Sequence, residues 1–271
     1  MTAIPICSDP PLSEEWHAAR LGGIGGSEIA TLLGLNPYST PLDLWLSKTG
    51  QAEPFTGNYA TRRGQHMEAF VLGTFADEHP GMVIETAPHD IPSIVAHPDV
   101  EAARCSLDGL AHDPLGTYVV EIKTAGRRAA SAWEDGGMPD SYRAQVGYQL
   151  AITGLDVAYV AADIAGDYTE RVVHADQAFS GYVLEFVSDW WAIHIVGGQM
   201  PDPDVVRDRD LLARIWEPDV TVEATVLDGD LIARLRDAKA AKTAAITDWE
   251  VAAASVQAVM RESVAAVDAA G

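Results

Sequence analysis

Two acidic residues and a lysine are the clearest candidates for chemistry in this sequence. Asp108 lies in the run Ser106-Leu107-Asp108-Gly109, and a possible hairpin separates it from Glu121-Ile122-Lys123. Side chains two positions apart on a strand share a face, so Glu121 and Lys123 would point the same way and Ile122 into the core. Two carboxylates beside an ammonium group suit metal-assisted hydrolysis of a phosphodiester.

This short pattern also has an ordinary explanation. Such strings occur by chance, and Glu121 and Lys123 could form a surface ion pair that contributes little to stability. Two further polar residues favour the chemical interpretation. Glu68, on an amphipathic helix, could hold a second metal or its water, and Gln145 could orient water or a phosphate oxygen without repelling either. Each of them alone would more often be an exposed helix residue.

A second set of residues suits a phosphate group. Ser27 follows a glycine-rich run and is predicted to cap a helix, where free N–H groups and the helix dipole favour an anion. Arg20 could bind the same phosphate with its fork of donors. Ser106 shares a strand face with Asp108 and could contact a phosphate near the metal. From spacing alone, a plain helix cap and a surface arginine remain the simpler explanation.

Composition limits the class of protein. A chain of 271 residues can form one large domain, or one domain with an appendage. The net charge of −22 argues against a generic nucleic-acid binder. A metal nuclease tolerates it, because bound ions offset carboxylates and a few cations can hold phosphates locally: Arg62, Arg63, Lys123, Arg127, Arg128 and Arg143.

The sequence predicts a cytoplasmic protein with no membrane segment. No apolar run approaches the roughly 18 residues that a membrane span needs, and the first residues do not resemble a signal peptide. Its two cysteines, Cys7 and Cys105, fit a reducing compartment. They also cannot supply the four thiolates of an iron–sulfur cluster.

Hydrophobic periodicity predicts an α/β fold with a mixed central sheet flanked by helices. Helices are expected at 14–20, 27–33, 41–49, 62–78, 139–153 and 180–196, and strands at 82–96, 104–111, 117–123, 155–164 and 170–174. In the helix over 62–78, Met67, Phe70, Val71 and Phe75 are expected on one buried side.

The C-terminal part has a different composition. From about residue 228 to 268 it is rich in alanine, and apolar residues recur at spacings near 3.5. An antiparallel helical hairpin packed on its own domain is favoured over an intermolecular coiled coil. We therefore expect a nuclease domain over 1–205 and a helical C-terminal extension over 206–271.

Five ordered blocks carry a resemblance to a known family. They are Trp16-His17-x-x-Arg20 with Ser27-Glu28, Arg63-Gly64-Gln65-x-x-Glu68, Cys105-Ser106-x-Asp108-Gly109, Glu121-Ile122-Lys123 and Ala144-Gln145-Val146-x-Tyr148. Together, over about residues 14–196, the chain resembles the YqaJ-like viral recombinase and lambda-exonuclease family of PD-(D/E)xK nucleases. The runs Gly34-Leu35-Asn36-Pro37-Tyr38 and Leu44-Trp45-x-x-Lys48-Thr49-Gly50 look like the YqaJ branch.

The resemblance implies a restriction-endonuclease-like core and a role for each site residue. Asp108, Glu121 and the backbone carbonyl of Ile122 would hold Mg²⁺, with Mn²⁺ as a possible substitute, and Lys123 would orient the attacking water. Glu68 would serve a second metal ion, and Gln145 would position the nucleophile and the scissile phosphate. Finally, three residues would bind a terminal 5′-phosphate: Arg20, Ser27 and Ser106.

The resemblance also implies an activity and partners. Members of the family act as processive 5′→3′ exonucleases on double-stranded DNA ends and leave a 3′ strand for an annealing or single-strand-binding protein. The prototype is a trimer, a homo-oligomer that the acidic surface makes unexpected here. It also has an extra acidic residue before the Ser-x-Asp block, a place that Asp99 or Glu101 could fill.

Two other functions are compatible with the sequence. A structure-specific or single-strand nuclease of the same superfamily would keep the chemistry, but such enzymes usually carry a four-cysteine cluster. A non-catalytic module that binds DNA ends or proteins would be expected to lose a metal carboxylate or the lysine. All three, Asp108, Glu121 and Lys123, are present.

Overall fold

The structure, a computed structural model, describes residues 2–52, 57–216 and 225–261. The chain divides into two compact units, Met1–Trp216 and Glu217–Gly271. The boundary expected at residue 205 falls inside the first unit, because helix α7 (Arg209–Ile215) belongs to it. Leu211 of α7 is buried with Leu42 and Leu46 of helix α3 (Pro41–Lys48).

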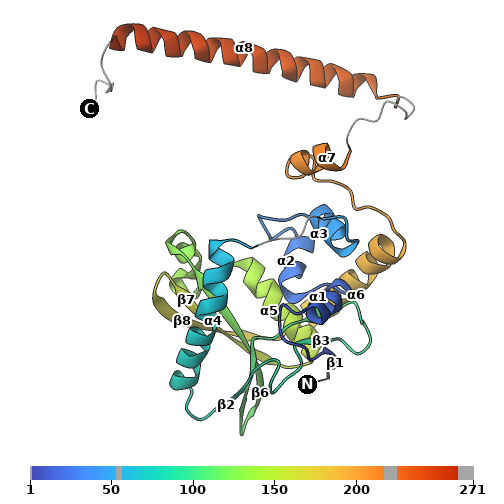
Figure 1. Ribbon diagram of the computed structural model, residues 1–271, viewed down its shortest axis with the longest axis vertical. Coiled ribbons are helices and arrows are strands. Elements are labelled where there is room, and N and C mark those ends of the chain that lie inside the picture. Colours follow the sequence, from blue (N-terminus) through green and yellow to red (C-terminus); the bar gives the residue numbers. More distant parts are fainter. Residues whose placement is uncertain (1, 53–56, 217–224, 262–271) are drawn as a thin grey trace. The chain divides into compact units, whose positions relative to one another are not determined.

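A five-stranded mixed sheet forms the centre of the first unit (Figure 1). Its order is β2-β5-β6-β7-β8, and the strands are β2 (Val83–Glu85), β5 (Gly109–Asp113), β6 (Gly116–Ala125), β7 (Val157–Ile164) and β8 (Asp167–His174). Only β6 and β7 pair in parallel. A parallel pair needs a crossover connection, which here contains helix α5 (Asp140–Thr153). The predicted mixed central sheet is confirmed.

The predicted hairpin joins β5 to β6. Asp113 pairs with Gly116 at its end, and Asp113 Oδ1 accepts hydrogen bonds from the backbone N–H groups of Leu115 (2.8 Å) and Gly116 (2.9 Å). An aspartate that bonds the backbone two residues ahead favours a tight turn. The turn thereby sets the register between the residues that follow Asp108 and those around Glu121.

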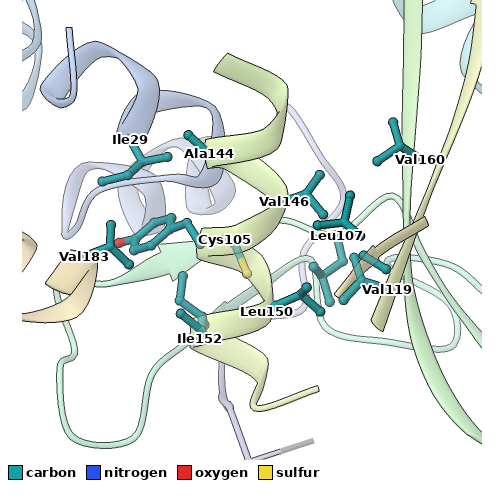
Figure 2. Packing of buried hydrophobic residues seen from close by; sticks show 14 of the residues in the cluster. Ile29, Cys105, Leu107, Val119, Ala144, Val146, Leu150, Ile152, Val160 and Val183 are labelled. Carbon is teal, nitrogen blue, oxygen red and sulfur yellow. The ribbon is translucent and has the colours of Figure 1, made fainter. Parts of the chain in front are cut away.

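Helices cover both faces of the sheet. On one face, Val119 and Val160 belong to the buried cluster that contains Val146 and Leu150 of α5. Figure 2 shows these α5 side chains on the side of Val119, whereas Ile29 and Val183 lie on the other side of the helix.

On the opposite face, helix α4 (Tyr59–Glu78) buries Val71 and Phe75 against Val120 and Ile122 of β6. Ile122 therefore faces the core, as expected. Phe70 does not follow the prediction, since it is 64% exposed.

A second, three-stranded sheet has the order β1-β3-β4, with β1 (Ile4–Cys7), β3 (Ile94–Ala96) and β4 (Arg104–Cys105). The continuous strand predicted over 82–96 is therefore wrong, because β2 and β3 belong to different sheets. The strand predicted over 104–111 is also interrupted. Residues 106–108 form an extended link that leaves the small sheet after β4 and enters the large sheet at β5.

The glycine-rich run contains a second departure. Helix α1 (Glu14–Leu21) is followed by a 3₁₀ turn η1 (Gly26–Glu28) and the short helix α2 (Ile29–Leu32). Ser27 lies inside the turn, so its predicted capping role is wrong. Gly25 occupies the cap position, and Glu28 Oε2 accepts its backbone N–H at 2.6 Å.

The remaining helices complete the two units. A 3₁₀ segment η2 (Arg127–Gly136) follows β6, and helix α6 (Gln177–Trp190) continues as a π-helical turn η3 (Trp191–Val196). In the second unit, α8 (Gly229–Met260) is one uninterrupted helix, so the predicted hairpin is wrong over these residues. None of the helices in the described part of the chain is long and apolar enough to cross a membrane.

Candidate active site

One cavity of about 300 Å³ gathers most of the residues that the sequence singles out. Seven of the predicted site residues line it: Arg20, Ser27, Glu68, Ser106, Asp108, Glu121 and Gln145. The extended link between the two sheets explains part of this convergence. Ser106, Leu107 and Asp108 all line the cavity, and Leu107 also belongs to the buried core.

Glu121 is the centre of a hydrogen-bond network between β6 and α5. Its carboxylate is buried and accepts hydrogen bonds from the side-chain amides of Gln145 and Gln149, each at 2.6 Å. Lys123 Nζ donates to the same carboxylate and to Gln145 Oε1 at 3.0 Å. Both oxygens of Glu121 therefore have charged or amide donors, which fix the orientation of the carboxylate.

Asp108 binds the backbone of β6 beside Glu121. Its Oδ2 accepts the backbone N–H of Ile122 at 2.7 Å, which ties the link between the sheets to β6. Burial raises the pKa of Asp108 well above its ordinary value, and the nearby charges of Glu121 and Glu68 raise it further. Asp108 thus lies in an environment with an excess of negative charge.

The pKa values of Lys123 and Glu68 are both raised at this site. Burial opposes the charge of Lys123, but Glu121 and Asp108 outweigh it and raise the pKa of this lysine, which stays an ammonium ion. Glu68 belongs to α4 at the edge of the cavity. Partial burial of its carboxylate, followed by the charge of Glu121, raises the pKa of Glu68.

The donor chemistry of this site fits a hard divalent cation. Three carboxylates, Glu68, Asp108 and Glu121, repel one another electrostatically, and Lys123 supplies one compensating charge. Oxygen donors are the ligands that Mg²⁺ prefers, and a bound cation would relieve this repulsion. Among the residues that the structure describes, no group of three or more His, Cys, Asp and Glu side chains is arranged to hold a metal ion by itself.

A backbone bridge brings the candidate phosphate residues to the carboxylates. Ile24 N donates to Ala102 O at 2.7 Å, and Arg104 N donates to Ile24 O at 3.0 Å. The segment can approach this closely because Gly23 has no side chain, since a Cβ there would lie 2.5 Å from Ala102 O. This bridge holds the segment that carries Arg20 and Ser27 beside the strand that leads to Ser106.

Arg20 is held in place by Trp16 of α1 and by Glu28, which itself pairs with the buried Lys48. Its guanidinium lies over the Trp16 ring, 4.8 Å from the centroid, and its Nη2 is 3.5 Å from Glu28 Oε1. Lys48 of α3 donates to Glu28 Oε2 at 2.7 Å and to the backbone carbonyl of Arg20 at 2.8 Å. Burial lowers the pKa of Lys48, although the Glu28 carboxylate opposes this shift. Lys48 therefore positions both Glu28 and Arg20.

Comparison with known proteins defines the family of this chain. Residues 15–156, more than half of the sequence, match the YqaJ-like viral recombinase domain. The chain belongs to the YqaJ-like viral recombinase family. A relative in Bacillus subtilis (strain 168), the uncharacterized protein YqaJ, is 29% identical over 195 residues. The match covers 70% of this chain and 59% of that relative, so the chain spans less than two thirds of its length.

The fold is shared with an alkaline exonuclease of known structure. LHK-Exo from Laribacter hongkongensis superimposes with a TM-score of 0.54 at 21% identity, covering 66% of this chain and 91% of that protein. Its structure in complex with dAMP gives the same TM-score at 20% identity and covers 75% and 97% of the two chains. At these identities the likeness supports the fold, and the activity of this YqaJ-like chain has to be argued from its own site.

Two residues of this YqaJ-like site do not follow from the sequence alone. Gln149 is fully buried and bonds Glu121, and it also donates to the backbone carbonyl of Ser106 at 3.3 Å. It lies one helical turn after Gln145, and residues four apart share a helix face, but this spacing alone does not separate a buried glutamine from an exposed one. Arg104 lines the cavity as well and contacts Glu101 Oε1 at 3.2 Å.

Two other expectations need correction. Neither Asp99 nor Glu101 lines the cavity, and Glu101 is exposed and paired with Arg104, so neither supplies an additional acidic residue to the site. Arg63, expected in a basic patch, forms an ion pair with Asp163 at 3.1 Å, which offsets its charge. Of the cations, Arg20 and Arg104 line the cavity, whereas Arg63 does not, and Lys123 lies behind it, bonded to Glu121 and Gln145.

Proposed function

We propose that this chain is a Mg²⁺-dependent 5′→3′ exonuclease that degrades linear double-stranded DNA and leaves 3′ single strands for phage-type recombination. Support comes from a single observation. The same cavity is lined by a carboxylate cluster suited to a divalent ion and by an arginine and two serines suited to a phosphate. A terminal phosphate bound there would hold the next phosphodiester of the strand close to the carboxylates.

The residues divide into groups with different tasks. Asp108, Glu121 and the backbone carbonyl of Ile122 would hold one Mg²⁺, and Glu68 would serve a second ion or its waters. Mn²⁺ could replace Mg²⁺, since both prefer oxygen ligands. When bound, the ions would polarise the phosphate and lower the pKa of the attacking water.

The side chains around the cation would perform the remaining steps. Lys123, an ammonium ion between Glu121 and Gln145, would hold the water in line with the scissile bond and offset charge that develops on the phosphate oxygens. The neutral amide of Gln145 would orient water and phosphate together. Gln149 would keep Glu121 oriented from the far side.

The terminal phosphate would be recognised by three residues on separate elements. Arg20 would bind it with two parallel N–H donors, and the hydroxyls of Ser27 and Ser106 would complete the contacts. Recognition of a free 5′-phosphate would give the reaction its direction, because only an end presents this group. The product strand would pass to an annealing or single-strand-binding protein in the cytoplasm of a bacterial host.

A digestion assay tests this function. Linear duplex DNA with 5′-phosphate ends, the same DNA with 5′-hydroxyl ends, and closed circles are incubated with the protein and Mg²⁺, with and without EDTA. We expect rapid loss of the 5′-phosphorylated linear DNA alone, and only without EDTA. Cutting of circles at the same rate would instead support an endonuclease and argue against the phosphate pocket. Absence of all cutting with Mg²⁺ and with Mn²⁺ would favour a non-catalytic DNA-end binder.

A further inference from the structure

Helix α8 carries a seam of mostly apolar residues, interrupted near its middle by Lys242. It is one uninterrupted helix, visible in orange and red in Figure 1. Large apolar residues of α8 are exposed, among them Leu235 (68%) and Trp249 (69%). A helix of a globular protein normally buries such residues against a neighbour, so the seam suits contact with another helix.

The seam follows the spacing of a coiled coil. Alternating steps of four and three residues connect nine positions: Leu231, Leu235, Ala238, Lys242, Ala245, Trp249, Ala252, Val256 and Val259. These are successive d and a positions of a heptad repeat that starts at a d position, and the repeat spans four heptads. A repeat sustained over this length is typical of helices that pair with another helix.

The order of large and small residues along the seam distinguishes two orientations. In a parallel pair each core position faces its own copy, so Trp249 would meet Trp249 and Lys242 would meet Lys242. Two bulky rings in one layer strain the packing, and two ammonium groups repel. A parallel pair of α8 helices is therefore disfavoured.

In an antiparallel pair, an a position of one helix faces a d position of the other. The register that aligns the seams then places Trp249 opposite Ala238, Leu235 opposite Ala252 and Leu231 opposite Val256. Large residues thus face small ones in the layers with the bulkiest side chains, which fills space evenly. Lys242 would face Ala245, and its long stem can lie over the alanine while its charge reaches water.

The charges of α8 favour the same orientation. Its first half, residues 229–244, contains four cations, Arg234, Arg236, Lys239 and Lys242, and two aspartates. Its second half, residues 245–260, contains only the anions Asp248 and Glu250. Antiparallel pairing sets the positive half of one helix against the negative half of the other, whereas parallel pairing sets like against like.

We propose that two copies of this chain associate through an antiparallel coiled coil of their α8 helices. The proposal does not depend on nuclease activity. It also differs from the trimer that the family resemblance implies, because an antiparallel pair has a two-fold axis and closes with two chains.

Molar mass in solution tests the proposal first. Light scattering during gel filtration of the full chain is expected to give the mass of two 28.9-kDa chains. The double variant Leu235→Glu/Trp249→Glu is expected to run as a monomer. The matched control Ala244→Glu/Val251→Glu adds the same charge at outward positions of the same helix and is expected to remain a dimer. Far-UV circular dichroism checks that all variants keep their helix content.

Cysteine cross-linking then tests the orientation. The native cysteines Cys7 and Cys105 are buried, so single variants Leu231→Cys and Val256→Cys, with different tags, can be oxidised alone and mixed. We expect a covalent dimer only in the mixture, joining the two tags. Covalent dimers of each variant alone would contradict the antiparallel register. A monomeric wild-type chain, or a trimer that persists in Leu235→Glu/Trp249→Glu, would refute pairing through α8.

Discussion

Gln149 donates a hydrogen bond of 2.6 Å to the carboxylate of Glu121. The two residues are far apart in the sequence, and both side chains are buried. The same amide donates to the backbone carbonyl of Ser106. One side chain of α5 thus connects the carboxylate centre on β6 to the segment that carries the phosphate-binding serine. Among the described residues, its own Oε1 is buried and has no hydrogen-bond partner.

Replacing Gln149 with leucine should therefore impair catalysis more than folding. The variant removes the unpartnered oxygen but leaves the buried Glu121 Oε2 without its donor, so we expect some loss of stability and a retained fold. We expect the rate of DNA digestion to fall about 10–100-fold, the loss typical of residues that orient a metal ligand, with a weakened apparent affinity for Mg²⁺. Thr153→Val is the control, since Thr153 is buried on the same helix and its hydroxyl bonds only backbone groups, the carbonyls of Gln149 and Leu150 and the N–H of Leu155. An unchanged rate in Gln149→Leu would remove Gln149 from the mechanism.

Glu121 and Lys123 can be placed on one face from the sequence, whereas the role of Gln149 cannot. The strand that carries Glu121 is rich in β-branched residues, which identify it as a strand, and residues two apart on a strand share a face. The role of Gln149 depends on the distance between α5 and β6, which is a tertiary property. A buried glutamine has no local signature that separates it from an exposed one.

Ser27 shows a different limit of sequence reasoning. A serine after glycines and before an apolar run resembles a helix cap, but here Glu28 bonds Gly25 in the manner of a capping box and shifts the turn by two residues. The side chain of Ser27 still faces the cavity. The heptad spacing of α8 was likewise readable, whereas the choice between a hairpin and a single helix required the three-dimensional structure.

Asp108→Asn should abolish activity and stabilise the metal-free protein. Because burial and the charges of Glu121 and Glu68 raise the pKa of Asp108, its proton is bound more tightly in the folded chain than in the unfolded chain. Protonation of Asp108 therefore stabilises the folded protein. This contribution to the free energy of unfolding is complete below the ordinary aspartate pKa and is lost as the pH rises through the raised pKa of the folded state.

At neutral pH, above the ordinary aspartate pKa, the wild-type protein has lost part of this stabilisation, whereas asparagine carries no charge at any of these pH values. We expect the variant to gain about 0.5–2 kcal/mol in the free energy of unfolding at pH 7 in EDTA. Urea titrations at several pH values measure this gain. It should shrink as the pH approaches 4, and a gain that is independent of pH would contradict its electrostatic origin.

Mg²⁺ should stabilise the folded wild-type protein, because it binds the folded carboxylate cluster and not the dispersed unfolded chain. At 100 times the dissociation constant, binding contributes about 2.7 kcal/mol. We expect a rise of several degrees in the melting temperature, and a much smaller rise in Asp108→Asn and Glu121→Gln. Equal rises in all three proteins would locate the bound ion elsewhere.

Lys48→Met should destabilise the protein, since it removes the buried ammonium group from Glu28 Oε2 and leaves only the more distant Arg20 beside this carboxylate. Leaving a buried charge without any partner costs about 3–5 kcal/mol, so we expect a smaller loss here, measured by urea titration. The double variant Lys48→Met/Glu28→Gln should recover much of this loss, because the glutamine oxygen can still accept the Gly25 N–H. A double variant as unstable as Lys48→Met alone would mean that packing, rather than the charge pair, gives Lys48 its importance.

Arg20→Gln should weaken recognition of the 5′-phosphate without harming the chemical step. Hydrogen bonds to a charged group contribute about 1.5–3 kcal/mol, so the preference for 5′-phosphate over 5′-hydroxyl ends should fall by roughly one to two orders of magnitude. The rate on 5′-hydroxyl DNA should stay the same, because Arg20 would contact only the terminal phosphate. Arg209→Gln makes the same change in charge at an exposed position outside the cavity and should keep the full preference. If Arg20→Gln slowed both substrates equally, Arg20 would act on the scissile phosphate rather than on the strand end.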